Sequence, residues 1–303
     1  PFLALDSFTL LLVVGFFLGV AGTIFAVGVP YVNAWFPPAK RGLAVGVFGA
    51  GMGGTAISAL TTVRLFEKGE SLPFVITAAL LAAYAVIAWL VLRDAPGRTR
   101  PTTRLAQRLR ANATLPVTWM TCALYAVAFG GYVAFSVYLP AYLITAHGLD
   151  AADASMRMAG FVVVAVIARP IGGAMADKVG AIPVLGVVFA VTAVCAAMAA
   201  GNPPLEAGGT VAFLAMAAAL GAGSGAVFAL IAQVTEPARV GGVTGIVGAA
   251  GGLGGFVPPL LMGYIYGRTD SYAIGLWLLA IVAALMLALT FGPVRRLGEA
   301  RSD

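Results

Sequence analysis

Charged side chains are scarce in this sequence. They make up 10% of the 303 residues, whereas a soluble domain carries about 25%. Hydrophobic residues make up 61%, and the mean hydropathy is +0.99. A soluble helical protein needs a charged outer face on its helices, and the composition does not supply one. These absences exclude a soluble fold and predict an all-α, polytopic membrane protein.

Residues that carry enzyme or metal chemistry are also few. The chain has one histidine, His147, and two cysteines, Cys122 and Cys195, without metal-ligand spacing. We find no acid–base pair inside an apolar segment and no phosphate-binding loop with its lysine. We therefore expect a protein that is not an enzyme, with no catalytic residue, no metal and no cofactor.

What the chain has in abundance is apolar sequence of membrane-spanning length. Charges and Pro/Gly breaks separate nine such segments. They cover residues 8–35, 42–64, 73–92, 117–144, 156–176, 181–200, 209–234, 241–266 and 272–291.

Connections rich in lysine and arginine alternate with connections rich in acid, for example 93–110 against 150–153. Basic connections stay on the cytoplasmic side, so we expect a multi-pass protein of the cell (inner) membrane with a cytoplasmic C-terminus. The orientation of the chain in the membrane then explains the net charge of +6, so this charge does not require nucleic acid as a partner. The expected partners are the lipid bilayer and a small anion, with the protein as a monomer.

The chain divides at its longest polar connection. Residues 1–92 hold three predicted spans, 93–116 form a basic cytoplasmic linker, and 117–303 hold six spans. PAKRG at Pro38 and PARVG at Pro237 stand 199 residues apart, which suggests two parallel repeats. Three spans before six, and a first residue that is not Met, predict a twelve-span bundle from which the first three spans are missing.

Two glycine-rich stretches, Gly42–Gly54 and Gly241–Gly255, lie inside apolar segments, where the backbone is forced into helix. Glycines three and four apart allow close helix approach. Either these glycines serve helix packing alone, or each stretch forms a glycine strip on its helix and the two strips face each other across a substrate path. The glycines assigned to such a path are Gly46, Gly49, Gly51, Gly53, Gly245, Gly248, Gly251 and Gly252.

Arg169 is the one ionisable side chain well inside a span, so it should face a polar cavity or a partner. Its planar guanidinium suits an oxyanion. The alternative is a structural arginine paired with an acid or with a helix-terminal carbonyl. Tyr125 and Phe129, four residues apart, could stack on a flat anion or simply pack. The segment Gly172–Gly180 is expected to be a short turn, with Asp177 and Lys178 as a gating loop or as a solvated pair.

These motifs resemble the major facilitator superfamily, and within it the nitrate/nitrite porter family. GGAMADKVG resembles the loop motif of the superfamily, and ARPIGG the arginine-bearing helix of the family's rear half. Trp35–Gly54 and Val240–Pro259 are similar to its paired glycine-rich motifs. The resemblance implies a substrate site made by Arg169, Phe25, Tyr125 and Phe129.

The sequence departs from that family at two positions. The front motif usually carries an asparagine near its final glycines, where this chain has Met52, Gly53 and Gly54, and Ser224 replaces a second common asparagine. The resemblance implies a secondary transporter that exchanges nitrate and nitrite by alternating access. A transporter of a small monocarboxylate and a non-transporting scaffold or sensor are the alternatives.

Overall fold

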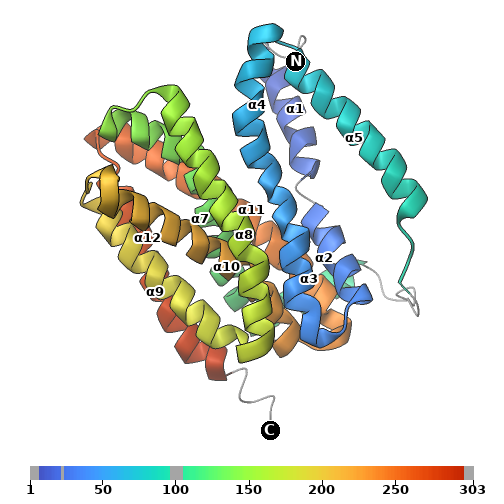
Figure 1. Ribbon diagram of the computed structural model, residues 1–303. Coiled ribbons are helices and arrows are strands. Elements are labelled where there is room, and N and C mark those ends of the chain that lie inside the picture. Colours follow the sequence, from blue (N-terminus) through green and yellow to red (C-terminus); the bar gives the residue numbers. More distant parts are fainter. Residues whose placement is uncertain (1–6, 22–23, 96–104, 297–303) are drawn as a thin grey trace.

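The computed structural model describes residues 7–21, 24–95 and 105–296, and the regular elements in these ranges are all helices (Figure 1). The N-terminal helices are α1 (Phe8–Ala21), α2 (Ile24–Trp35), α3 (Arg41–Gly49), α4 (Gly54–Lys68), α5 (Leu72–Val91) and α6 (Leu105–Ala113). The C-terminal helices are α7 (Pro116–His147), α8 (Ala151–Val179), α9 (Ala181–Ala200), α10 (Thr210–Val234), α11 (Pro237–Thr269) and α12 (Ala273–Leu289). Short 3-10 turns at Pro38–Lys40 and Ala50–Gly53 flank α3, and π-helical turns at Leu205–Gly209 and Thr290–Val294 extend α10 and α12.

Within the described residues, eight helices are long and apolar enough to cross a membrane, which confirms the predicted fold class. The 3-10 turns join α3 and α4 into one such span, Pro38–Thr62. The first predicted segment, 8–35, instead carries two shorter helices, α1 and α2. Apolar side chains cover the outside of the molecule, for example Trp89, which is 88% exposed. The chain is therefore a multi-pass membrane protein whose outer surface faces lipid.

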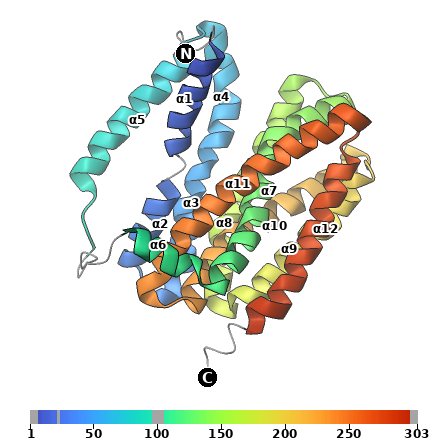
Figure 2. The same cartoon turned by 180° about the vertical axis from the view of Figure 1, so that it is seen from behind.

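The helices gather on two sides, α1–α5 on one and α7–α12 on the other, as both views show (Figures 1 and 2). α3 packs on α8, and α2 packs on α11. The connection before α7 contains a helix, α6, which lies against the start of α11. Residues 96–104 of the predicted linker lie outside the described residues.

Local sequence explains where the long helices begin and end. Proline occupies the first turn of α7 and of α11, where no backbone N–H is needed. The Asp150 carboxylate accepts a hydrogen bond from the Asp153 amide and caps α8. Gly148, at φ 67°, ends α7 in the left-handed conformation that glycine adopts most easily.

The prediction of a turn over Gly172–Gly180 is wrong. α8 continues to Val179, and Gly180, at φ 90°, is the single residue between α8 and α9. Gly172 and Gly173 are helical because the backbone inside a membrane must satisfy its own hydrogen bonds. Glycine is needed there because a Cβ at Gly172 would collide with Ala222 of α10, and one at Gly173 with Gly42. A glycine pair that signals a turn in water here permits close helix packing.

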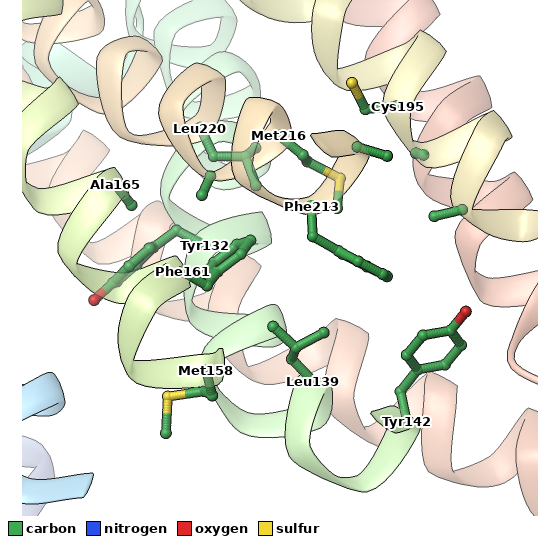
Figure 3. Close-up of a cluster of buried hydrophobic side chains, with 14 of the residues drawn as sticks. Tyr132, Leu139, Tyr142, Met158, Phe161, Ala165, Cys195, Phe213, Met216 and Leu220 are labelled. Atoms are coloured by element: carbon green, nitrogen blue, oxygen red, sulfur yellow. The ribbon is translucent and has the colours of Figure 1, made fainter. Parts of the chain in front are cut away.

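Two buried clusters form the interior of the α7–α12 side. One gathers Tyr132, Phe161, Phe213, Leu220 and their neighbours (Figure 3). The other gathers Tyr125, Phe189, Phe228, Val247 and their neighbours. Tyr125 and Tyr132 belong to the same helix, α7, so this helix joins the two clusters, and the site described next lies between them.

Candidate functional site

Arg169 lies in the middle of α8, is only 2% exposed, and is among the largest fully buried side chains. Its Nη2 donates a hydrogen bond to the Tyr125 hydroxyl at 3.1 Å, and its Nη1 contacts the Met52 sulfur at 2.8 Å. Its Nε has no hydrogen-bond partner. Among the described residues, no carboxylate lies within ion-pair distance of it. A buried cation without a counter-ion or a full set of acceptors suits an anion site.

Aromatic rings surround the guanidinium. Its Cζ lies 5.2 Å from the centre of the Phe25 ring and 5.7 Å from that of Phe129. The Tyr125 and Phe129 rings stack in parallel, 5.1 Å apart, and Phe25 lies 6.1 Å from Phe129. The structure thus brings together the four residues singled out as substrate-binding, from α2, α7 and α8. The two phenylalanine rings thus lie next to each other against the guanidinium and hold it by cation–π contacts.

A small cavity adjoins Arg169. Its volume is about 10 Å³, and its polar side chains besides Arg169 are Tyr132 and Ser224. This space holds about one water molecule, so an anion with several oxygens needs a side chain to move. Met52 also lines the cavity and covers Nη1. Because a thioether is a weak acceptor on a flexible chain, Met52 is the side chain most easily displaced.

The glycines of the first strip pack on α8. A Cβ at Gly46 would lie 2.6 Å from Pro170 Cα, and one at Gly49 would collide with the Arg169 guanidinium. Gly53 approaches Val166, with 3.5 Å left for a Cβ, while Gly51 has nothing within 4 Å.

The second strip packs mainly on α7. A Cβ at Gly251 would lie 3.0 Å from Phe129 Cδ1 and closer still to the Tyr125 ring. Gly248 approaches Phe25 at 3.8 Å, Gly252 has nothing within 4 Å, and Gly245 lies on the same helix. The contacts of the two strips thus run to α8, α7 and α2 rather than from strip to strip. Gly49 and Gly251 make room for the site's own side chains.

Asp177 joins α8 to the start of α3. Its carboxylate accepts hydrogen bonds from the backbone amides of Gly42 at 3.1 Å and Leu43 at 2.9 Å. These are orphan donors of a helix N-terminus, which favours a negative charge. Lys178, the neighbouring residue, is exposed. The acid therefore serves the contact between the two sides of the molecule, and the base faces outward.

Sequence reasoning overlooked two side chains of the site. Met52 attracted notice only as a departure from a motif, and its contact with Arg169 joins positions 117 residues apart. Tyr132 lies on the same face of α7 as Tyr125 and Phe129, because spacings of four and three residues keep side chains on one helix face. Extending that pattern by one turn would have found it.

Comparison with known proteins places the chain in a family. The sequence pattern of the Major Facilitator Superfamily matches residues 1–199 and 121–302. The chain is 49% identical over 289 residues to a "Probable nitrate/nitrite transporter NarK2" of Mycobacterium tuberculosis, covering 95% of this chain and 73% of the relative. It is 34% identical over 279 residues to a "Nitrite extrusion protein" of Bacillus subtilis, covering 92% and 70%.

Solved structures share the fold. The E. coli fucose:proton symporter FucP superposes with a TM-score of 0.66 at 14% identity, over 88% of this chain and 72% of that one. A bacterial homologue of the iron transporter ferroportin superposes with a TM-score of 0.65 at 16% identity, over 89% and 68%.

Proposed function

Since the chain belongs to the major facilitator superfamily, we propose that it is a secondary transporter that moves a small planar inorganic anion, nitrate or nitrite, across the cell membrane. The relatives named for nitrate and nitrite support this substrate class. The observation that carries the proposal is the buried Arg169 guanidinium, which donates a hydrogen bond to Tyr125 and lies against the adjacent rings of Phe25 and Phe129.

The chemistry of the site favours a flat, delocalised anion. Two parallel N–H donors of a guanidinium match two oxygens of one anion, and the flanking rings favour a planar group over a bulky one. Among the described residues no carboxylate faces Arg169, so the site offers no evident proton carrier. Exchange of one anion for the other follows as the transport mode, with no chemical conversion of either.

Alternating access requires two bodies that rock against each other. We assign them to residues 1–92 and 117–303, joined by the basic linker 93–116. The Asp177 contact with the start of α3 would close one end, and the glycine strips would let the helices slide closely past each other. The basic connections put this closed end, and the C-terminus, on the cytoplasmic side.

The test is anion exchange in proteoliposomes that contain the protein expressed from its whole gene. Vesicles loaded with nitrite should take up external nitrate, and empty vesicles should take up far less. Acetate and formate added outside serve as competitors. If they inhibit as strongly as nitrite does, the site is one for monocarboxylates, and no exchange of any of these anions would favour a scaffold or sensor.

A further inference from the structure

We propose that the Tyr132 hydroxyl is a further substrate-binding group, which holds the third oxygen of nitrate and thereby distinguishes nitrate from nitrite. The inference rests on the proposed function, because it names a selectivity determinant of the same site. Its starting point is a buried hydroxyl that makes no hydrogen bond.

Tyr132 is 3% exposed, and its hydroxyl has no hydrogen-bond partner. Figure 3 shows its ring among apolar side chains and its hydroxyl pointing away from them. The Thr55 hydroxyl faces it from the start of α4, but not in hydrogen-bonding geometry. Buried hydroxyls are almost always bonded, so an orphan one suggests a missing acceptor.

The place for that acceptor is the cavity beside Arg169. Tyr132 lines this cavity, and Arg169 is near enough to exert its charge on the tyrosine. Ser224 also lines it, but its hydroxyl already donates to the Leu220 carbonyl at 2.8 Å. Tyr132 and the Nε of Arg169 are left as donors without acceptors. Two residues that line one small space and each carry a donor without an acceptor are suited to an oxygen-rich anion.

An anion that replaces Met52 on Nη1 would lie between these groups. Anionic oxygen is a far stronger acceptor than thioether sulfur, so the exchange is favourable. Two oxygens engage the guanidinium. Nitrate has a third oxygen for the Tyr132 hydroxyl, whereas nitrite has none left. Tyr132 therefore stabilises bound nitrate and contributes little to bound nitrite.

The same geometry predicts what happens in the empty protein. An unbonded buried hydroxyl destabilises the fold, so Tyr132→Phe should leave thermal stability unchanged or raise it. A tyrosine with a structural role would behave in the opposite way. Tyr138→Phe is the matched control: Tyr138 lies on the same helix, and no contact links it to Arg169.

The experiment measures nitrate and nitrite Kd by titration calorimetry in detergent, with the protein expressed from its whole gene. For Tyr132→Phe we expect nitrate binding to weaken about tenfold, the effect of one charge-assisted hydrogen bond. Nitrite binding should change by less than about twofold. Tyr138→Phe should match the wild type for both anions.

Equal weakening for the two anions, or no change for either, would overturn the role of Tyr132. A lower melting temperature for Tyr132→Phe would also count against it. If the wild type binds neither anion, the proposed function itself fails. That result differs from every outcome in which the wild type binds and only the selectivity prediction is wrong.

Discussion

A single buried charge organises the site. Arg169 has no described carboxylate beside it, yet it is held by an uncharged hydroxyl, a sulfur and two ring faces. Such a set orients the guanidinium without neutralising it. Neutralisation is then left to the substrate, which explains how a cation can be buried and still be available for binding.

We predict that Arg169→Lys keeps the fold and loses most of the nitrate affinity. Lysine retains the charge but cannot present two parallel donors. Each lost charge-assisted hydrogen bond weakens binding by about tenfold or more. Melting temperature should fall by no more than about 3 °C, which corresponds to about 1 kcal/mol in a chain of this size. A nitrate titration measures the loss of affinity, and a thermal melt of the same variant measures the change in melting temperature.

The matched control is Arg157→Lys, an exposed arginine at the other end of α8. It should bind nitrate as the wild type does. If Arg169→Lys also retains wild-type affinity, the arginine is structural and the ligand role is wrong.

The sequence was informative about Arg169, Tyr125 and Phe129, because a charge inside a span and aromatics four apart are local signals. Phe25 was indicated only by the resemblance to the nitrate/nitrite porter family. The sequence was not informative about Met52 or Tyr132. Their importance comes from contacts between helices, such as Met52 with Arg169, and no local pattern encodes the rotation of one helix against another.

At the scale of whole helices, apolar length sufficed to find most spans, since a buried backbone must bond to itself. The ends of the helices were harder to predict. Gly172–Gly180 carries turn residues, yet α8 runs through it until Gly180. Its glycines are there for the close approach of α3 and α10, and only the packed structure reveals those neighbours.

Neighbouring glycines on α11 provide a matched test of packing at the site. A Cβ at Gly251 would press on the rings of Tyr125 and Phe129, whereas one at Gly252 would meet nothing within 4 Å. Gly251→Ala should therefore displace the rings and weaken nitrate binding by about tenfold, a cost typical of overpacking. Gly252→Ala should bind as the wild type does.

The test compares the nitrate Kd and the thermal melting of the two alanine variants with those of the wild type. Equal affinity in both would mean that the α7–α11 contact does not shape the site. Loss of folding in Gly251→Ala, rather than loss of binding, would assign this glycine to helix packing alone.

For the molecule as a whole, the two sides meet closely at one end. There Gly42 touches Gly173, Gly46 touches Pro170, and Asp177 bonds to the start of α3. Toward the other end α4 and α8 diverge in both views (Figures 1 and 2). These contacts between the two sides are concentrated on α3 and α8 at one end of the molecule, which suits the proposed rocking of one side against the other.

Asp177→Asn should open this closed end. The carboxylate bonds to two amides at a helix N-terminus, and asparagine keeps the size while removing the charge that the helix dipole favours. Losing part of a charge-assisted bond shifts the equilibrium between closed and open forms by about three- to tenfold.

The measurement uses cysteine labelling. With Cys122 and Cys195 replaced by alanine, a cysteine introduced at the site by Ser224→Cys reports the opening by reacting with a membrane-impermeant thiol reagent. Labelling should rise in inside-out vesicles and not in right-side-out ones, because the Asp177 end faces the cytoplasm in the proposed orientation. Asp153→Asn, an exposed acid at the opposite end of α8, should leave labelling unchanged. Greater labelling from the external side would reverse the orientation, and unchanged labelling from both sides would remove Asp177 from the gate.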